Sequence, residues 1–318
     1  MTPPVTVVVP TRNRRPVLAE TLGAVTGQTG VDVCVVVVDE GSSDDTAAFL
    51  ADLGDDRVQV VRHDQPRGLP AARNVGLKHA ATPWVAFCDD DDLWAPDKLA
   101  SQLAALASRP DCRWSCTGTV SVDHDLRLLG YQRPYDGDDL ARAVRVRNVV
   151  PAGGSSVVVD RELALELGGF DEVLGACEDW DMWVRLAQRS PVAVVDRPLV
   201  AYRVWPGSMS SDPDHMRHWH ELVVDRYRNG VPAEVARAAL VDKEQYLGRF
   251  YLRRRRRLAG AAHFLRMAVR LRLPTHFVHA AVALLAPGLG ERRADRREVS
   301  AVPPAWAAEA ESWLGVRR

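Results

Sequence analysis

The sequence lacks the compositional marks of several protein classes. Its 318 residues carry 41 Lys and Arg against 42 Asp and Glu, which leaves a formal net charge of −1. Without an excess of positive charge, the chain is not expected to bind nucleic acid. It contains no uninterrupted apolar run of about 18 residues, so we expect no transmembrane helix. The first residues lead directly into a strand-like segment, and we expect no signal peptide.

Cysteine is scarce, and its spacing matches no known framework. The five cysteines are Cys34, Cys88, Cys112, Cys116 and Cys177. Cys112 and Cys116 are four positions apart, but no second Cys or His pair completes a zinc site. An odd number without framework spacing is typical of a reducing compartment, so we expect a cytoplasmic protein.

Two glycine-rich phosphate-binding motifs are also missing. No G-x-G-x-x-G follows the first apolar run, and the chain contains no G-x-x-x-x-G-K-[ST]. The first absence counts against a dinucleotide-binding fold, and the second excludes a P-loop enzyme.

The first hundred residues do contain four apolar runs, each followed by a helical pattern. The runs are Val5–Val9, Val33–Val38, Val58–Val61 and Val85–Cys88, and the helices are expected at 17–26, 47–53, 71–80 and 97–108. Runs that are continuously apolar are typical of parallel strands buried on both faces. The pattern therefore predicts an α/β domain with a mostly parallel central sheet covered by helices on both faces.

Four aspartates, Asp89, Asp90, Asp91 and Asp92, come directly after the fourth apolar run. Adjacent carboxylates cannot be buried unpaired, so we expect the aspartate run to face a cleft or solvent where the strand ends. A divalent cation such as Mn²⁺ or Mg²⁺ would relieve their repulsion, taking one or two carboxylates together with substrate phosphates. The alternative is a solvated acidic turn that caps the following helix.

Polar side chains also follow the first two apolar runs. Thr11 and Asn13 come after the first, and Asp39 ends the second. Because the carboxyl ends of parallel strands share one edge of a sheet, we expect these side chains to meet the aspartate run in one cleft.

The second part of the chain has a different pattern. Strand-like runs are separated by irregular segments, which predicts mixed pairing; they lie at 114–122, 155–159, 192–195 and 201–204. The small residues of the segment 151–156 predict a flexible approach that lets a ligand come close to the backbone. A helix is expected to open at Glu178, and from about Asp214 the pattern is entirely helical.

Six short motifs occur in a fixed order. They are VVVPTRNR at 7–14, VDEGSSD at 38–44, ARNVG at 72–76, FCDDDD at 87–92, GGFDE at 168–172 and EDWDMWVRL at 178–186. In this order they resemble the GT-A glycosyltransferases of family 2, over roughly residues 5–210. The resemblance implies an inverting transferase that uses a nucleotide-diphospho-sugar donor; we expect a UDP-sugar, with dTDP- and GDP-sugars as alternatives. Processive members carry a Q-x-x-R-W segment and membrane helices; this chain has neither, which favours a single transfer.

On the donor side, the resemblance assigns roles to several residues. Asp39 matches the aspartate that hydrogen-bonds the nucleotide base, and Thr11 and Asn13 match the turn beside that base. Arg73 matches an arginine that contacts the donor diphosphate.

The aspartate run overlays the D-x-D motif of the family. There Asp91 would hold the metal ion, while Asp89 and Asp90 would contact the ribose and the waters of the metal. On the acceptor side, Asp179 matches the general base, with Glu178 and Trp180 beside it as candidate residues of the acceptor pocket.

Two positions depart from the family pattern. Glu40 stands where an aspartate is usual. Trp205 stands where many members have a histidine that helps to hold the metal and the diphosphate. Tryptophan cannot coordinate a metal ion, so either Asp91, phosphates and water hold the cation, or His215 or His218 replaces the missing ligand.

These observations predict a GT-A domain at 1–211, with a nucleotide-sugar half at 1–110 and an acceptor half at 111–211, and a helical extension at 212–318. The expected function is transfer of a sugar to a hydroxyl of a glycan, a lipid-linked intermediate or a small molecule, as in cell-envelope polysaccharide biosynthesis. Two alternatives stay open: a catalytically impaired nucleotide-sugar-binding or scaffold protein, and a metal-dependent nucleotidyltransferase.

The helical extension is rich in arginine. Arg253–Arg257 form a block, and Arg266, Arg270 and Arg272 follow without an intervening acid. This pattern predicts peripheral contact with an anionic membrane at its inner face, with Phe264 and Leu265 inserting. The alternative is that these arginines pair with the acidic catalytic domain or stay solvated.

Overall fold

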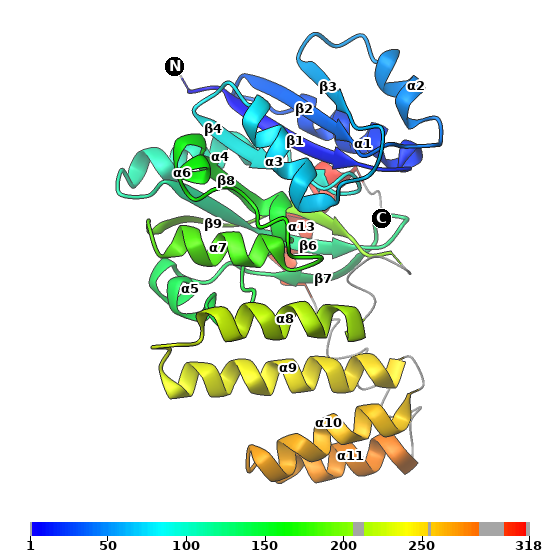
Figure 1. Cartoon of the computed structure of the whole chain (residues 1–318), viewed down its shortest axis with the longest axis vertical. Helices are drawn as coiled ribbons and strands as arrows, with labels where there is room; N and C mark the ends of the chain where they lie inside the picture. Colours follow the sequence, from blue (N-terminus) through cyan, green and yellow to red (C-terminus); the bar gives the residue numbers. More distant parts are fainter. Residues whose placement is uncertain (1, 206–212, 254–255, 286–301, 316–318) are drawn as a thin grey trace. The chain divides into compact units, whose positions relative to one another are not determined.

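The computed structural model describes residues 2–205, 213–253, 256–285 and 302–315. The chain divides into two compact units. The sheet unit comprises Met1–Val144, Asn148–Pro206 and Val302–Arg318, and the helical unit comprises Arg145–Arg147 and Gly207–Ala301. We describe each unit by itself (Figure 1).

The first half of the sheet is parallel throughout. Its strands are β1 (Val5–Thr11), β2 (Val33–Asp39), β3 (Val58–Arg62) and β4 (Trp84–Phe87), arranged in the order β3-β2-β1-β4. The register pairs Thr11 with Asp39, so the polar ends of β1 and β2 lie side by side. The parallel sheet predicted from the four apolar runs is confirmed.

Helices cover both faces of the inner strands, as the continuous apolar runs predict, whereas the edge strand β3 stays partly exposed. The four helices are α1 (Arg15–Thr26), α2 (Thr46–Ala51), α3 (Leu69–His79) and α4 (Lys98–Ser108). Val7 and Val35 pack in one core cluster with residues of α1 and α4, whereas Val36 packs with Ala72 of α3 on the other face. In Figure 1, α3 crosses in front of the strands. A Cβ at Gly76 would lie 2.1 Å from Val8 Cγ1, so the glycine allows α3 to approach β1 closely.

The second half of the sheet has mixed pairing. It adds β5 (Leu93–Trp94), β6 (Trp114–Val122), β7 (Leu128–Gln132), β8 (Val157–Asp160) and β9 (Val192–Arg203). β8 is antiparallel to both β4 and β6, while β6 and β9 are parallel. The helices of this half are α5 (Gly137–Ala143), α6 (Arg161–Glu166) and α7 (Glu178–Ala187).

Two local predictions need correction in this half, and three short elements were not predicted. The runs 192–195 and 201–204 belong to one strand, β9, because Pro198 falls where the register against Gly118 is irregular and a ladder hydrogen bond is not needed. The predicted strand 155–159 begins only at Val157, after a 3-10 helix, η1 (Gly153–Ser156). The short strands β5 and β7 and the helix α5 were not predicted.

The last described helix, α13 (Pro304–Leu314), belongs to the sheet unit. Ala310 packs in a core cluster with residues of β6 and β9, and Arg197 Nε donates to Glu309 Oε1 at 2.6 Å. The prediction that residues 212–318 form one helical extension is therefore wrong for this helix, whose short apolar pattern carries no information about its partner.

The helical unit contains α8 (Pro213–Tyr227), α9 (Ala233–Arg253), α10 (Arg257–Arg270) and α11 (Thr275–Leu285). Leu252 of α9, Phe264 and Met267 of α10 and Ala283 of α11 form its core. Among the described residues, no helix combines the length and the apolar character needed to cross a membrane. Arg254 and Arg255 of the arginine block lie outside the described residues.

Candidate active site

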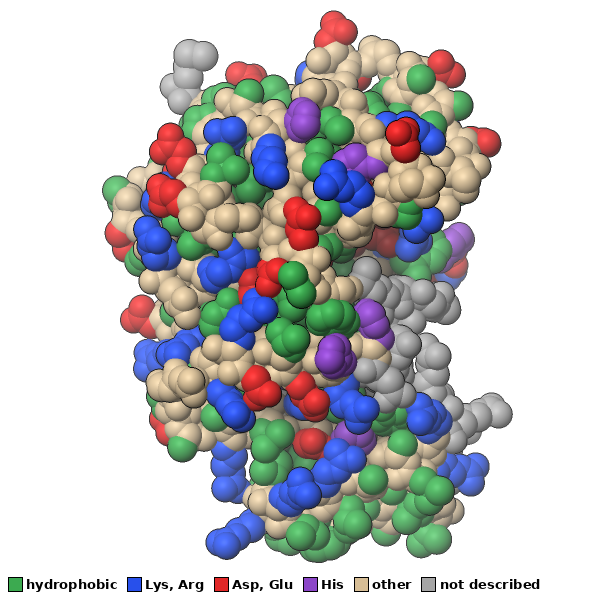
Figure 2. Space-filling view, viewed as in Figure 1, with side chains coloured by type: hydrophobic (Ala, Val, Ile, Leu, Met, Phe, Trp, Pro, Cys, Tyr) green, Lys and Arg blue, Asp and Glu red, His purple; other side chains and the backbone are tan. Residues whose placement is uncertain are grey.

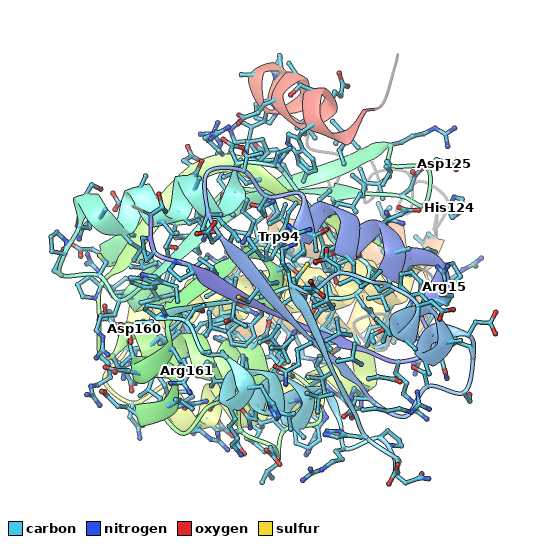
Figure 3. The ribbon with its side chains drawn as sticks, turned by 90° about the horizontal axis from the view of Figure 1, so that it is seen from above. Arg15, Trp94, His124, Asp125, Asp160 and Arg161 are labelled. Carbon is cyan, nitrogen blue, oxygen red and sulfur yellow. The ribbon has the colours of Figure 1, made fainter. Side chains whose placement is uncertain are left out.

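The predicted site residues lie along the edge of the sheet where β1, β2 and β4 end. The register of β1, β4 and β8 places Asp160 at the opposite edge, next to Trp84. In Figure 3, Arg15, which follows β1, and Asp160 mark these two edges. The expectation that the polar ends of the strands share one edge is thus met.

Asp39 is fully buried, and its carboxylate is fixed by two partners. Oδ1 accepts a hydrogen bond from the Ser42 backbone N–H at 2.9 Å, and Oδ2 pairs with Arg62 of β3. Arg62 also donates to the Ser42 carbonyl at 2.8 Å. The guanidinium therefore holds both the carboxylate and the turn that follows β2.

Asn13 joins the turn after β1 to the turn after β2. Its φ of 55° is in the left-handed region, which Asn tolerates better than most residues. Its Oδ1 accepts from the Ser43 N–H at 2.8 Å, and its own N–H donates to Ser42 Oγ at 2.9 Å. Thr11 adds a link to the aspartate run, because its Oγ1 donates to Asp90 Oδ2 at 2.6 Å. These contacts bring the turns after β1, β2 and β4 together, as predicted, while the cleft between them stays a prediction.

The contacts of Glu40 explain why a glutamate stands where the family pattern usually has an aspartate. Its Oε2 accepts from the backbone N–H groups of Arg67 and Gly68 at 2.6 and 2.7 Å, and its Oε1 lies 2.5 Å from His63 Nδ1. Gly68 precedes the first residue of α3. The side chain of Glu40 therefore fixes the loop from which α3 starts.

The aspartate run is not a solvated turn. Asp89, Asp90 and Asp91 are half-buried and Asp92 is fully buried, while α4 begins at Lys98 without any side-chain cap. The alternative of an acidic cap for the next helix is therefore wrong.

Asp92 also corrects the expectation that no member of the run would be buried. Its Oδ1 accepts from the Arg203 N–H at 3.1 Å, whereas its Oδ2 has no hydrogen-bond partner. Burial, with the neighbouring carboxylates of Asp91 and Asp89, raises the pKa of Asp92 well above its usual range. A protonated Asp92 avoids the cost of a buried charge, a possibility that the count of carboxylates alone does not reveal.

The two central aspartates carry raised pKa values. Burial raises the pKa of Asp90 to about 7, and burial together with the charge of Asp89 raises the pKa of Asp91 to about 6. A bound divalent cation would favour the charged forms of both groups. No set of three or more His, Cys, Asp or Glu side chains within the described ranges is arranged to hold a metal ion by itself. Mg²⁺ and Mn²⁺ take few protein ligands when substrate phosphates complete the shell, so Asp91 fits such a cation.

Arg14 connects Trp205 with the aspartate run. The Arg14 guanidinium lies 5.9 Å from the centre of the Trp205 ring, and its NH2 lies 4.0 Å from Asp91 Oδ2. His124, labelled in Figure 3, packs edge-on against the same ring. Residues 206–210, which complete the family segment with the metal-side histidine, lie outside the described residues. His215 and His218 belong to the helical unit, and their suggested role stays a prediction.

Arg73 connects the aspartate run to the first turn of α7. Its side chain is 2% exposed; NH1 donates to Glu178 Oε1 at 2.6 Å and NH2 to Asp89 Oδ1 at 2.7 Å. Burial alone would lower the pKa of Arg73, but the carboxylates of Asp89, Glu178 and Asp179 raise it above its usual range. Both terminal nitrogens bind carboxylates of the chain itself, and the expected contact with a diphosphate stays a prediction.

Glu178 and Asp179 open α7 from a residue in the left-handed region, Cys177 with φ of 62°. Burial raises the pKa of Glu178 to about 7, with the Arg73 cation acting in the opposite direction. Burial also raises the pKa of Asp179, again opposed by Arg73. Asp179 Oδ1 accepts from the Trp180 N–H at 2.6 Å, and Oδ2 accepts from Asn148 Nδ2 at 3.4 Å. Asp179 is half-buried as a residue, whereas Glu178 is enclosed.

The glycines of η1 make room for these charged side chains. A Cβ at Gly153 would lie 2.7 Å from Asp179 Oδ2, and a Cβ at Gly154 would lie 3.1 Å from Arg73 NH2. The segment 151–156 was predicted to be a flexible approach for a ligand. In the structure its small residues instead allow η1 to pack against Arg73 and Asp179.

Trp180 does not line an open pocket. It is 1% exposed, and its indole N–H donates to the Val144 carbonyl. The expectation that Trp180 contributes to an acceptor pocket is therefore wrong: the residue belongs to the core that holds α7 in place.

Several supporting residues were missed by sequence reasoning. Asn74 Oδ1 accepts from the Phe170 N–H at 2.7 Å, and its Nδ2 donates to the Phe170 carbonyl at 2.8 Å. Phe170 lies under Arg73, whose guanidinium carbon is 5.4 Å from the ring centre. Ser155 Oγ accepts from the Asp89 N–H at 3.0 Å. Asn74 and Phe170 stand in recognisable motifs, but no local signal indicates their contact, and Asn148 carries no signal at all.

A sequence model described as Glycosyl transferase family 2 matches residues 6–166, about half of the chain. The chain belongs to this family. The resemblance seen in the ordered motifs is confirmed, and membership argues against a nucleotidyltransferase.

This family 2 glycosyltransferase is similar to two bacterial relatives that are named as glycosyltransferases. A UDP-Glc:alpha-D-GlcNAc-diphosphoundecaprenol beta-1,3-glucosyltransferase, WfgD of Escherichia coli, is 23% identical over 222 residues, covering 69% of this chain and 85% of the relative. A putative teichuronic acid biosynthesis glycosyltransferase, TuaG of Bacillus subtilis, is 29% identical over 213 residues, covering 66% of this chain and 82% of the relative.

A solved structure confirms the fold. The crystal structure of S. aureus TarS 1-349 in complex with UDP-GlcNAc matches with a TM-score of 0.58 and 17% identity, covering 92% of this chain and 90% of that chain. The likeness supports the GT-A type of α/β fold that the motifs imply.

Proposed function

We propose that the chain is an inverting, non-processive transferase that moves a sugar from a UDP-sugar to a hydroxyl of a glycan or lipid-linked acceptor. The observation that carries this proposal is the pair of hydrogen bonds that Arg73 donates to Asp89 and Glu178. They join the aspartate run to the turn that bears Asp179. The fixed guanidinium of Arg73 thereby sets the spacing between the donor side and Asp179, the candidate general base. The names of the two relatives, and the UDP-GlcNAc held by the structural neighbour, support the choice of donor and acceptor class.

On the donor side, Asp39 accepts an N–H of the base, and Thr11 and Asn13 shape the turn beside it. Asp91 would hold a divalent cation, Mn²⁺ or Mg²⁺, with the donor phosphates and water completing its coordination. Charge on the leaving diphosphate is offset by such a cation when bound.

On the acceptor side, Asp179 accepts the proton of the acceptor hydroxyl. The hydroxyl oxygen then attacks the anomeric carbon on the face opposite the diphosphate, so the configuration inverts. The raised pKa of Asp179 suits this role, because a base works best when its pKa approaches the operating pH. Arg73 acts as a positioning residue that keeps Asp89 and Glu178 at fixed places.

The remaining alternative is a nucleotide-sugar-binding protein without transfer activity. Trp205, in place of a metal-side histidine, is the observation that favours it. The two proposals differ in chemistry: a transferase releases UDP slowly from a UDP-sugar even when water is the acceptor, whereas a binding protein does not.

Calorimetry with UDP, GDP and dTDP, in Mn²⁺ and in EDTA, tests the donor side. We expect UDP to bind most tightly, EDTA to weaken binding, and Asp91→Asn to remove the effect of EDTA. Asp111→Asn, a change at an exposed aspartate of the same unit, serves as the matched control. Equal affinity for the nucleotide in Mn²⁺ and in EDTA would contradict a role for the cation. Arg14 would then be the positive charge beside Asp91.

A further inference from the structure

Helix α10 carries a second apolar face besides the one that it buries. Phe264 and Met267 pack in the core of the helical unit. Leu258, Leu265 and Val269 are 80%, 47% and 60% exposed and lie seven and four positions apart, which puts them on one side of the helix. A helix that needed only to pack on its neighbours would not require this second stripe.

Helix α11 continues the exposed apolar surface. Ala280 and Ala283 are buried, whereas Phe277, Val278 and Leu285 are 49%, 61% and 86% exposed. Exposed apolar side chains gathered in this way on two adjacent helices mark an interaction surface rather than scattered exceptions.

The structure changes which residues are available to a membrane. Phe264 was predicted to insert, but it is buried and a Cβ at Gly248 would lie 2.9 Å from its ring. Leu265 remains exposed, and the apolar residues of α11 take the place of Phe264. The sequence did not reveal this exchange because both sides of α10 are apolar.

The two helices that form this surface carry charge of one sign. Residues 256–285 contain no Asp or Glu, and Arg257, Arg270 and Arg272 are exposed. Figure 2 shows hydrophobic side chains beside Lys and Arg side chains over these helices. We define the α10–α11 surface as the exposed residues Leu258, Leu265, Val269, Phe277, Val278, Leu284 and Leu285 together with these three arginines.

We propose that the α10–α11 surface docks on an anionic lipid bilayer. Arginines pair with lipid phosphates while the apolar side chains between them enter the headgroup and acyl boundary. A second copy of this surface would bring arginine against arginine, and a nucleic acid would leave the apolar side chains uncovered. The proposal goes beyond the sugar transfer proposed above and does not depend on it.

Co-sedimentation of the full chain with vesicles tests the proposal. We expect binding to phosphatidylcholine vesicles that contain phosphatidylglycerol, little binding to phosphatidylcholine alone, and loss of binding as salt is raised. Each arginine near an anionic surface contributes roughly a fivefold gain in partitioning at best, so Arg257→Gln, Arg270→Gln and Arg272→Gln together should lower it by up to about 100-fold. Replacing Leu258 and Val269 by Ser should weaken binding to the same vesicles.

Matched controls come from the sheet unit. Arg109→Gln, Arg127→Gln and Arg142→Gln remove three exposed arginines elsewhere, and Val173→Ser removes an exposed valine. These variants should sediment like the wild type. UDP affinity and thermal melting, measured on every variant, show that the fold is intact and keep this test separate from that of sugar transfer.

Two outcomes would overturn the proposal. One is a protein that stays in the supernatant with anionic vesicles at low salt. The other is concentration-dependent dimerisation in light scattering that disappears in the Leu258→Ser, Val269→Ser variant, because the apolar surface would then be covered by a second copy. Loss of vesicle binding in both α10 variants and in neither control would support it.

Discussion

At the scale of single residues, the molecule buries charge in two different ways. Arg73 is enclosed, and two carboxylates bind its terminal nitrogens, although its Nε has no hydrogen-bond partner. Lys98 is enclosed without a hydrogen-bond partner for its ammonium, which lies 3.7 Å from the centre of the Trp94 ring. The first arrangement keeps the ion charged, whereas the second favours the neutral amine.

The Asp179→Asn variant tests the base. Amide nitrogen and oxygen cannot accept the hydroxyl proton, so transfer should fall by about 10²–10⁴-fold, the usual contribution of a general base. Donor binding should change little, because Asp179 touches no donor-side group. Transfer assays with calorimetry of UDP on the same preparation give both quantities. Activity within about tenfold of wild type would remove Asp179 from the mechanism.

The Lys98→Met variant tests the unpaired ammonium. Burial lowers the pKa of Lys98 to about 7, with the Cys88 thiol acting weakly in the opposite direction. The unfolded chain therefore binds more protons than the folded chain between about pH 7 and the usual lysine pKa of about 10.4, and the stability of the wild type should rise across that window. Near pH 6 the charged form costs its full amount, so Lys98→Met should be more stable by on the order of 1–4 kcal/mol.

The measurement is the free energy of unfolding of Lys98→Met and wild type at several pH values. The advantage of the variant should shrink as the pH rises from 7 to 10. A difference that does not depend on pH would mean that Lys98 stays charged in the folded protein.

At the scale of elements, the site depends on how closely α3 approaches its neighbours. Gly76 lets α3 lie on Val8 of β1, and Asn74 ties the same helix to the backbone of Phe170. Arg73 directly precedes Asn74 on α3. The helix is thereby held in place next to the residue that joins the two halves of the site.

Gly169→Ala should disturb this arrangement. A Cβ there would lie 2.3 Å from Asn74 Oδ1, and the φ of 73° adds strain. We expect a loss of about 2–4 kcal/mol in the free energy of unfolding, together with weaker transfer, because Asn74 and Phe170 support Arg73.

Gly168→Ala is the matched control. Its φ of 83° carries the same backbone strain, but nothing lies within 4 Å of its Cβ. It should cost only about 1–2 kcal/mol. Denaturant unfolding gives the free energy of unfolding of both variants. Equal losses of that free energy would show that the contact with Asn74 is unimportant.

At the scale of the whole molecule, the helical unit is an insertion. The chain leaves the sheet unit after β9 and returns to it at Val302 with α13. Trp306 of α13 is buried, with Tyr131 at 5.7 Å between ring centres and Arg133 over its face at 4.9 Å. A Cβ at Gly118 would lie 2.3 Å from the Trp306 ring, so the glycine of β6 provides the space for it.

Trp306→Ala should therefore destabilise the sheet unit. Removing a buried tryptophan costs about 3–5 kcal/mol through lost burial and the cavity that remains. The melting of UDP-binding activity on heating reports the sheet unit specifically. Ser312→Ala, at an exposed position of the same helix, should leave that melting unchanged. An unchanged melting of Trp306→Ala would mean that α13 adds nothing to this unit.

Local patterns in the sequence determined much of the fold and of the site. Continuous apolar runs predicted β1, β2 and β4, because burial on both faces leaves no room for alternation. The run at 58–61 also predicted β3, although that edge strand has no fully buried residue. The polar ends of those strands predicted that Thr11, Asn13, Asp39 and the aspartate run share one edge, since parallel strands end on the same side. The ordered motifs predicted the family, because each motif places close together in the sequence the residue types that a nucleotide-sugar site needs.

Only the tertiary structure decided which distant residues meet. Arg73 and Glu178 are 105 positions apart, and Asn74 and Phe170 are 96 apart, so no local pattern records their contacts. Burial reversed two expectations: Asp92 is enclosed, which raises its pKa, and Trp180 belongs to the core. The carboxylate partners of Arg73 were also not expected. The pairing of α13 with the sheet unit was equally hidden. Composition and periodicity report which residues prefer burial. The packing of the whole chain decides which partners each buried residue contacts.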